Sequence, residues 1–278
     1  MTYELQPDKF HLIKELHNEM DFDLLTPAIV EGKITGRIWV NNPEKPSTAL
    51  VWDEHYSFFL MGDESNQLFN SSLDVLFADI IIPDALSRNY REGWLEVPSR
   101  WRKKIEQNEV LPNLFPMHHA REHYAIHQST GLKWAEKILP GLSLDQIDDE
   151  FLKRTDLENL KTVLDMISVR WKSVENFLRW GFGFILSQNT TIVSYCLSLG
   201  NGNGRCDIEI ETIEGHQRQG YASLLTAAFV DHALTAGYTE IGWDAFAANV
   251  PSVQLALKLG FKKKEDHVCY SGRYNAVD

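Results

Sequence analysis

The sequence predicts an α/β (α+β) protein, in which a mixed, mostly antiparallel sheet flanked by helices is preceded by a second, smaller α/β domain. Residues 206–212 alternate apolar and polar side chains, as a half-buried strand does. Apolar residues then recur at helical spacing over 221–233. Strand and helix patterns continue to alternate as far as residue 270. Such alternation is typical of a sheet domain covered by helices.

The second half of the chain supplies the elements of this sheet in a regular order. Residues 188–190 predict the turn of a hairpin, and the Asn-Gly pairs within 200–204 predict another tight turn. Gly260 is the stop that a preceding helix favours. The expected helices cover 144–166, 174–180, 221–233 and 249–259, and the expected strands cover 181–187, 191–199, 206–212, 240–243 and 261–270.

The first half of the chain shows its own set of strands and helices. A turn-rich segment at 41–46 separates its first two strands, and Ser99 is a residue type that caps a helix beginning at Trp101. We therefore expect one domain over 1–128 and a second over 129–278. The remaining expected elements are helices over 7–15 and 67–80 and strands over 34–40, 49–52, 56–61, 94–97 and 124–126.

Composition narrows the class of protein. Hydrophobic residues make up 44% and charged residues 24% of the 278 residues, a balance typical of a soluble globular protein. No apolar run reaches the length of a bilayer span, and the first residues do not resemble a signal peptide. The three cysteines are too scattered for a disulfide framework or a zinc cluster. We expect a cytoplasmic location.

The net charge is −12, which argues against nucleic acid or an anionic membrane as the main partner. The charge is compatible with a cationic amine substrate. It is more simply explained as a source of solubility.

The segment Gln217-Arg218-Gln219-Gly220-Tyr221-Ala222 carries the most functional information. It lies between the strand at 206–212 and the helix at 221–233. A glycine turn at a helix N-terminus presents unpaired N–H groups and the positive end of the helix dipole. Because Gly220 has no Cβ, the main chain can approach a ligand closely there. The pattern predicts a phosphate or pyrophosphate site.

This segment resembles the signature of the GNAT superfamily of acyl-CoA-dependent N-acetyltransferases, a Gln/Arg-x-x-Gly-x-Gly/Ala turn that opens a helix. Gln217, Gly220 and Ala222 match it. Asn249 follows at a strand-to-helix junction, and Lys258-Leu259-Gly260-Phe261 matches the superfamily's helix ending. The resemblance covers about residues 177–270, the size of one such domain.

The resemblance implies acetyl-CoA as co-substrate and assigns roles to individual residues. Backbone N–H groups of residues 217–222 would hold the pyrophosphate of coenzyme A. The backbone of Ile210 and Thr212 would pair with the pantetheine arm, and Asn249 and Ser252 would bond the cofactor from the next helix. The two central strands would separate, with the acyl thioester in the gap.

Catalysis in this class is direct attack of a neutral amine on the thioester, which a base assists. Glu209 and Glu211 are candidates because they share one face of the strand that enters the site. Acidic residues that alternate on a strand are more often simply a solvated face. Many members of the superfamily carry a tyrosine acid seven residues after the asparagine, where this chain has Ala256. The acid is therefore absent, supplied by another residue such as Tyr270, or unnecessary.

A group of histidines offers a metal site as an alternative. On a helix, His119, His123 and His127 would share one face. Residues 124–126 are typical of a strand, however, so we expect no metal. For Lys262-Lys263-Lys264, a solvated strand edge is favoured over contact with the 3′-phosphate of the cofactor.

The sequence thus predicts an N-acetyltransferase that moves an acetyl group from acetyl-CoA to an amine or peptide amine. The alternative is a non-catalytic acyl-CoA-binding protein with a regulatory or scaffolding role. The whole chain resembles a bacterial subgroup of two-domain GNAT proteins in which the first part is a degenerate copy of the fold. That part lacks the glycine-rich turn, so we expect it to shape the acceptor pocket or to mediate homodimerisation. The acceptor itself is not identified by the sequence.

Overall fold

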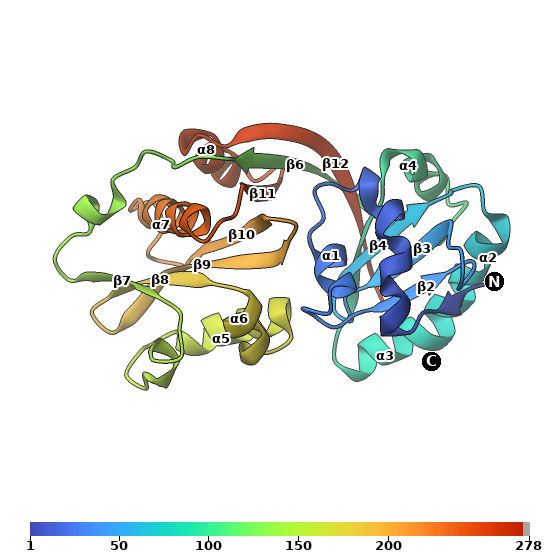
Figure 1. Ribbon diagram of the computed structural model, residues 1–278, viewed down its shortest axis with the longest axis horizontal. Coiled ribbons are helices and arrows are strands. Elements are labelled where there is room, and N and C mark those ends of the chain that lie inside the picture. The colour runs from blue at the N-terminus through green and yellow to red at the C-terminus, as the bar shows by residue number, and fades with distance from the viewer. Residues whose placement is uncertain (275–278) are drawn as a thin grey trace. The chain divides into compact units, whose positions relative to one another are not determined.

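The computed structural model describes residues 1–274, and the chain forms two compact units (Figure 1). Unit 1 comprises Met1–Arg121 together with the chain from Asp266 onward, and unit 2 comprises Glu122–Glu265. The predicted class is confirmed, because both units combine helices with a mixed, mostly antiparallel sheet. The domain boundary expected at 128/129 stays a prediction, and the last strand, β12, ends on the sheet of unit 1.

Unit 1 contains a sheet in the order β1-β2-β3-β4-β5-β12. Strands β2, β3 and β4 form an antiparallel meander, whereas β4 and β5 are parallel. The elements begin and end as follows: β1 Tyr3–Glu4, η1 Pro7–Glu19, α1 Leu25–Val30, β2 Arg37–Val40, β3 Thr48–Trp52, β4 Ser57–Gly62, α2 Gln67–Leu76, η2 Phe77–Ile81, α3 Ile82–Ser87, β5 Glu92–Glu96 and α4 Ser99–Glu106.

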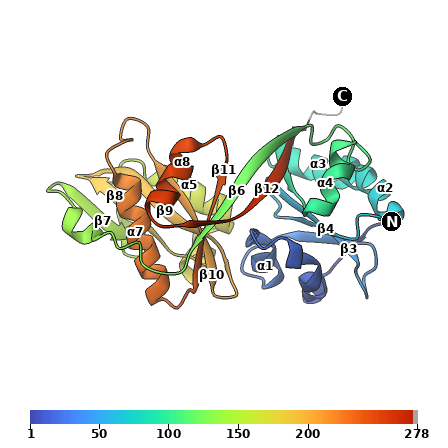
Figure 2. The same ribbon diagram turned by 90° about the horizontal axis from the view of Figure 1, so that it is seen from above.

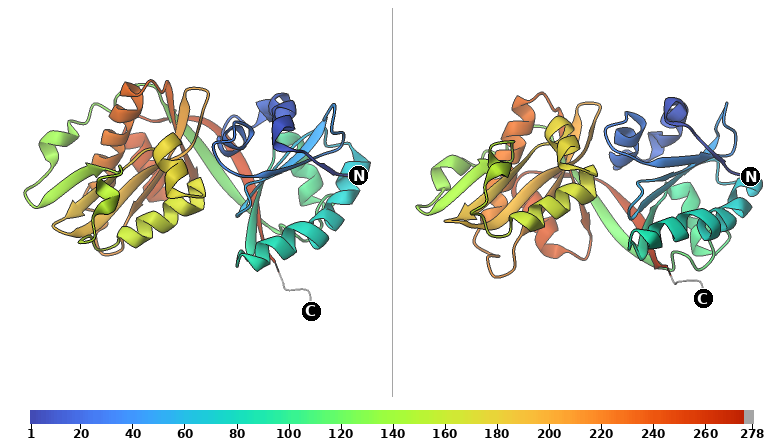
Figure 3. Two further views of the ribbon diagram at one scale, coloured as in Figure 1. Left: turned by 60° about the horizontal axis from the view of Figure 1, so that its bottom comes forward. Right: turned by 90° about the horizontal axis from the view of Figure 1, so that it is seen from below.

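The core of unit 1 lies between its sheet and the helices that follow β4. Helices η1 and α1 cover one face, and α2 and α3 cover the other (Figure 3). Strands β3 and β4 are short and almost wholly buried, so they read as continuous apolar runs. The three rings of Trp52, Phe58 and Phe77 pack in sequence within this core.

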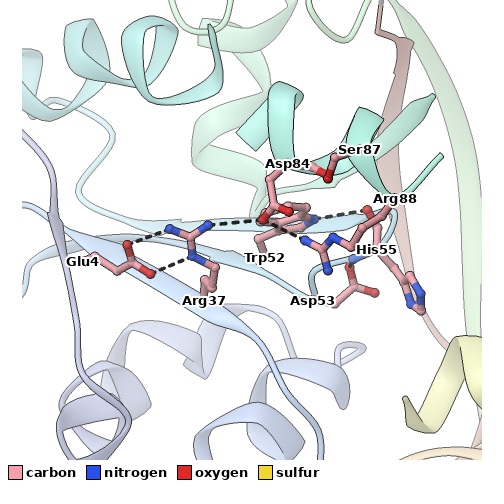
Figure 4. Close-up of polar contacts among 8 residues, drawn as sticks. All are labelled: Glu4, Arg37, Trp52, Asp53, His55, Asp84, Ser87 and Arg88. Atoms are coloured by element: carbon pink, nitrogen blue, oxygen red, sulfur yellow. Dashed lines mark hydrogen bonds and ion pairs between the residues drawn. The ribbon is translucent and has the colours of Figure 1, made fainter. Parts of the chain in front are cut away.

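An ion cluster ties the edge of this sheet to helix α3 (Figure 4). The guanidinium of Arg37 donates to both oxygens of Glu4, at 2.7 and 2.8 Å, and lies 3.4 Å from Asp84. Arg88 donates to the same Asp84 carboxylate at 2.8 Å and lies over the ring of Trp52. Every member has a structural partner, so we interpret the cluster as an anchor.

Unit 2 contains a sheet in the order β12-β6-β11-β10-β9-β8-β7. Its centre is again an antiparallel meander, β8-β9-β10, followed by a parallel pair, β10 and β11. The elements begin and end as follows: β6 Met117–Ile126, η3 Trp134–Lys137, β7 Leu142–Gln146, η4 Phe151–Lys153, α5 Leu160–Trp171, α6 Val174–Trp180, β8 Gly183–Gln188, β9 Thr191–Gly202, β10 Arg205–Thr212, α7 Tyr221–Thr235, β11 Glu240–Phe246, α8 Val250–Lys258 and β12 Lys262–Arg273.

Helix α7 lies on one face of the unit 2 sheet, and α5 and α6 lie on the other (Figure 1). The core beneath α7 is built from the apolar side of β10 and from residues of the helix such as Leu225 and Phe229. Because β10 alternates, Cys206 and Ile208 enter this core while Asp207 and Glu209 project from the opposite face.

The two units repeat one order of elements: meander, crossover helix, parallel strand, helix and final strand. The final strands are exchanged. Strand β6 follows α4 of unit 1 and lies next to β11 of unit 2, whereas β12 follows α8 of unit 2 and pairs with β5 of unit 1. Strands β6 and β12 are neighbours in the sheet (Figure 2). This repeat agrees with the expected likeness of the first part to the second.

One sequence prediction is wrong and another is confirmed. The helix expected over 144–166 is instead the strand β7, a short 3-10 turn and α5. Leu142 and Leu144 of β7 pack on the core of unit 2, so sheet pairing overrides the local charge pattern. The hairpin at 200–204 is confirmed, since Asn203 and Gly204 both have positive φ and Gly202 pairs with Arg205.

Other predictions concern histidines, cysteines and membranes. The strand expected at 124–126 is confirmed as part of β6, which carries His119 and His123, while His127 directly follows its last residue. Within residues 1–274, no group of histidine, cysteine or acidic side chains is arranged to hold a metal ion. All three cysteines are buried and outside any disulfide. No helix in the described chain combines the length and apolarity needed to cross a membrane.

Candidate functional site

The turn between β10 and α7 is open and shaped by glycine. Gly220 precedes the helix with φ +84°, a left-handed conformation that favours glycine. A Cβ built on Gly220 meets no atom within 4 Å, so the space beside this backbone is empty. Residues 217–220 are exposed. A ligand could therefore reach the main chain directly.

The first turn of α7 supplies donors for such a ligand. In the described chain, the N–H groups of Gly220, Tyr221, Ala222 and Ser223 donate to no backbone carbonyl. Around them the side chains are held locally, because the Tyr221 hydroxyl donates to Gln219 at 2.9 Å. These N–H groups and the helix dipole suit an anion.

Strands β10 and β11 separate next to this turn. They pair in parallel only from Arg205 with Glu240 to Asp207 with Gly242. Strand β10 continues to Thr212 on the side of β9 alone, and its pairing with β9 shifts register between Cys206 and Asp207. From Ile208 to Thr212 the backbone of β10 therefore has β9 on one side and no paired strand on the other, and we refer to this unpaired side as the gap between β10 and β11.

The start of α8 faces this region of the sheet with two polar side chains. Asn249 caps the helix, since its Oδ1 accepts from the Ser252 N–H at 3.3 Å. The indole of Trp243 donates to the Ser252 hydroxyl at 3.0 Å. The amide group of Asn249 and the hydroxyl group of Ser252 still have donors to offer a ligand. Ala256 is buried in the core beneath α8.

The two acidic candidates on β10 share a face, as expected, and each has a partner. Arg170 of α5 donates to the Glu209 carboxylate through Nε at 3.0 Å and Nη2 at 2.8 Å. The Tyr195 hydroxyl donates to Glu211. Burial and the neighbouring Glu211 raise the pKa of Tyr195, so this hydroxyl stays protonated. Glu209 is partly exposed and ion-paired rather than simply solvated.

Tyr270 belongs to unit 1, whereas the other candidate residues belong to unit 2. Its ring is part of the unit 1 core, and its hydroxyl donates to Glu106 at 3.1 Å. Burial and the Glu106 carboxylate raise the pKa of this phenol. Its role as an acid stays a prediction.

The lysines at the start of β12 have local partners. Lys263 pairs with Glu122 at 2.8 Å, and Lys264 lies 3.4 Å from Glu240. These ion pairs join β12 to strands of the same unit, in keeping with a structural role.

A separate cavity of about 410 Å³ opens near the C-terminal end of α7. It lies at the opposite end of that helix from Gly220, because Ala236 and Gly237 contribute to its wall. Its remaining lining residues are Gln146, Arg179, Trp180, Gly181, Phe182, Gly204, His232 and Tyr238.

Sequence reasoning missed a buried polar group at the point where β10 and β11 separate. It consists of His123 on β6, Asp207 on β10 and Asp244 on β11. His123 was considered only as a metal ligand. The available signal was an acid inside an apolar strand pattern, in Cys206-Asp207-Ile208 and Trp243-Asp244-Ala245.

Comparison with known proteins adds to this geometry. A profile described as GNAT acetyltransferase matches residues 14–270. The uncharacterized N-acetyltransferase YdfB of Bacillus subtilis (strain 168) is 23% identical over 267 residues, which cover 96% of this chain and 97% of that protein.

Solved structures share the fold over the whole chain. A GCN5-related N-acetyltransferase-like protein from Streptococcus suis 89/1591 superposes with a TM-score of 0.67 at 20% identity, covering 96% of this chain and 99% of that one. A tandem GNAT protein from the clavulanic acid biosynthesis pathway has a TM-score of 0.60 at 10% identity and is covered completely, as is this chain.

Proposed function

The chain belongs to the GNAT acetyltransferase family, and from that premise we propose that it transfers an acetyl group from acetyl-CoA to an amine. The observation that carries this proposal is the open turn at Gly220 beside the gap between β10 and β11. One end of this region offers anion-binding N–H groups, and beyond Asp207 the edge of β10 that faces away from β9 has no partner strand. An extended molecule with a pyrophosphate at one end and a thioester at the other fits this arrangement.

Each part of acetyl-CoA has a proposed partner in unit 2. The N–H groups of residues 217–222 hold the pyrophosphate, aided by the dipole of α7. The backbone of Ile210 and Thr212 pairs with the amides of the pantetheine arm. Asn249 and Ser252 donate to the cofactor from the start of α8. These positions all lie in unit 2.

The chemistry needs a neutral amine, because an ammonium group has no lone pair for attack on the thioester carbonyl. On the proposal, Glu209 is the better of the two strand carboxylates, since Glu211 already accepts from Tyr195. The pair with Arg170 fixes Glu209 in place. Collapse of the tetrahedral intermediate breaks the C–S bond, and the electron pair leaves with sulfur. A thiolate is stable enough to leave without an acid, so Ala256 can replace a tyrosine.

The partner that we propose is a small amine or a peptide amine, because the net charge of −12 favours cations over nucleic acid. A cytoplasmic location fits acetyl-CoA chemistry and free thiols. We leave a homodimer as a proposal for solution measurement.

The absence of a tyrosine at position 256 favours one rival, a non-catalytic acyl-CoA-binding protein. Mixing the purified full chain with acetyl-CoA and a panel of primary amines, amino acids and peptides separates the two. Release of free thiol that depends on an amine supports the transferase. Tight coenzyme A binding without thiol release supports the rival, and the absence of any binding overturns both.

The placement of the cofactor has its own test by calorimetry with coenzyme A. A Gly220→Asp variant puts a carboxylate against the pyrophosphate, so we expect affinity to fall by about 100-fold or more. Gly131→Asp is the matched control, because Gly131 also has positive φ, is exposed, and has no atom within 4 Å of a built Cβ. Unchanged affinity in the Gly220 variant would refute this placement.

A further inference from the structure

A histidine lies fully buried in the middle of β6, within unit 2. The side chain of His123 is 0% exposed, and its Nδ1 lies 3.7 Å from Oδ2 of Asp244 on β11. Among residues 1–274, neither ring nitrogen has a partner within hydrogen-bond distance. A buried imidazole normally has such a partner, so this one needs a functional or structural reason.

A second carboxylate reaches the same histidine across β11. Asp207 of β10 is 7% exposed and pairs in register with Gly242. A Cβ built on Gly242 would lie 1.8 Å from Oδ1 of Asp207 and 3.0 Å from Cε1 of His123. The missing side chain at Gly242 is therefore what lets the Asp207 carboxylate lie across the strand beside the imidazole.

The Asp–His–Asp group lies at the point where β10 and β11 separate. Asp207 and Gly242 form the last register pair before β10 and β11 separate. Asp244 follows on β11 inside the separated region, and its side chain is 18% exposed, the most accessible of the three. Asp207 also shares the face of β10 that carries Glu209. The group thus borders the gap in which the proposed function places the thioester.

The charges around His123 favour its protonated form. Burial opposes that form, but the pair with Asp244 and the charges of Asp207 and Asp244 outweigh burial and raise its pKa, while Arg205 acts in the opposite direction. Arg205 itself is engaged by Glu240 at 2.7 Å. Two carboxylates and one imidazole carry net negative charge in either protonation state, which suits a cationic ligand.

We propose that Asp244 receives the ammonium group of the acceptor, and that the Asp244–His123 pair takes its proton, with Asp207 holding the imidazole. This inference rests on the proposed function and names its substrate class, a cationic primary amine. Asp244 is the catalytic residue in this scheme and takes the role of base in place of Glu209, and His123 and Asp207 are positioning residues.

In the proposed step, two protons leave the acceptor nitrogen and one electron pair leaves with sulfur. The ammonium nitrogen loses one proton to the pair, and its freed lone pair forms a bond to the thioester carbonyl carbon. The C–S bond then breaks and its electron pair leaves on sulfur. The second proton from nitrogen goes to that thiolate, which gives an amide and free coenzyme A. The pair returns its proton to solvent before the next turnover.

The decisive variants are Asp244→Asn and His123→Gln, with Glu240→Gln as the matched control on the same strand. For an amine that releases thiol in the panel, we expect Asp244→Asn to lower kcat/KM by about 100-fold or more. We expect coenzyme A affinity to stay within about twofold, because neither residue touches the cofactor in the proposed arrangement. Glu240→Gln also removes a buried charge but should leave kcat/KM at its optimum pH within about twofold, because Glu240 lies outside the Asp–His–Asp group.

The pH profile separates catalysis from a merely structural role. Wild-type kcat/KM should fall as the pH drops through the raised pKa of His123, and His123→Gln should abolish that limb. A structural role would lower thermal stability and leave the profile in place. Equal rates and profiles in wild type and Asp244→Asn would overturn the proposal while leaving the transferase intact.

NMR tests whether an ammonium group binds at Asp244 even if no amine in the panel reacts. In protein carrying labelled histidine, the His123 resonance is assigned by its loss in His123→Gln. Adding n-butylammonium in the presence of coenzyme A should shift that resonance in wild type and not in Asp244→Asn. No shift in wild type at any concentration would count against the site, whereas failure of coenzyme A itself to bind would instead remove the proposed function.

Discussion

Unit 1 and unit 2 share an order of elements, but they close the turn after the meander in opposite ways. In unit 1, β4 ends at Gly62, where a built Cβ would lie 2.2 Å from the Ser47 carbonyl oxygen. The Asp63 N–H also donates to that carbonyl at 2.8 Å. In unit 2, the space beside Gly220 is empty. Both turns use a left-handed glycine, but only one leaves room for a ligand.

The two units also differ in what contacts the backbone at the end of the last meander strand, β4 in unit 1 and β10 in unit 2. In unit 1, the indole of Trp101 from α4 donates to the Gly62 carbonyl oxygen at 3.0 Å. A buried side chain thus takes the backbone carbonyl at the end of β4, whereas the Thr212 carbonyl at the end of β10 accepts at 3.4 Å from Gln217 of the exposed turn itself. Asp63 and Glu64 add negative charge to the unit 1 turn. The comparison teaches that a binding site in this fold needs a turn beside which no backbone or side chain packs, as at Gly220.

The largest effect is expected for Trp101→Ala, which tests whether the Trp101 indole blocks the turn after β4 in unit 1. Trp101 is fully buried, so we expect a loss of about 4 kcal/mol in the free energy of unfolding, measured with urea. Trp101→Phe keeps most of the volume and should cost about 1–2 kcal/mol through the lost hydrogen bond. Calorimetry should still find one coenzyme A per chain, because Asp63 and Glu64 remain. A second bound equivalent would contradict the comparison.

A pair of glycine substitutions tests the two turns directly. Gly62→Ala forces a Cβ against backbone at positive φ, so we expect a loss of about 3 kcal/mol or more. Gly220→Ala meets open space and should cost only about 1 kcal/mol, from its backbone conformation. Urea unfolding of both variants provides the measurement. Equal losses would mean that the two turns are packed alike.

A pair of helix caps gives a smaller and more selective effect. The Asn66 side chain accepts from the Phe69 N–H at 3.1 Å, and Asn249 accepts from Ser252 at 3.3 Å. Substitution of either by alanine should cost about 1 kcal/mol of stability. Only Asn249→Ala should also weaken coenzyme A binding, by about fivefold, since it removes one proposed hydrogen bond. Calorimetry that finds the same affinity in both variants would remove Asn249 from the site.

The smallest effect concerns the acidic turn of unit 1. The Ser65 hydroxyl, and then the Ser65 N–H, lower the pKa of Asp63. A lowered pKa contributes stability above the ordinary pKa and loses it as the pH falls through the folded value. We therefore expect Asp63→Asn to cost well under about 1 kcal/mol at pH 7 and nothing in strong acid. Ser65→Ala, which removes the hydroxyl that lowers the pKa of Asp63, is the control. Urea unfolding of both variants should show a small loss of stability at pH 7 and none in strong acid.

Much of the fold was accessible from the sequence because its signals are local. The alternation around Ile208, the helical spacing after Gly220 and the Asn203-Gly204 turn each predict an element that the structure confirms. Strand β7 was missed because its leucines take part in a pairing that charge patterns do not reveal. The exchanged places of β6 and β12 depend on contacts between distant segments, which one sequence does not encode in any local pattern.

The candidate site was only partly accessible for the same reason. The turn at 217–222 could be found because its glycine and flanking elements are contiguous. The partners Arg170 and Tyr195 of the two strand acids come from other elements. His123 and Asp244 meet only because β6 lies next to β11. Tyr270 was placed by sequence in the second domain, but its strand ends in unit 1.

The exchange of final strands also constrains how the chain is made. Glu96 at the end of β5 pairs with Cys269 of β12. During synthesis from the N-terminus, the ribosome releases β5 long before it releases its neighbour, so that edge of unit 1 must wait without a partner. Unit 1 can be completed only when the last strand emerges. A truncated product that lacks β12 would therefore carry an open sheet edge, and its aggregation would report that the nascent chain had been cut short.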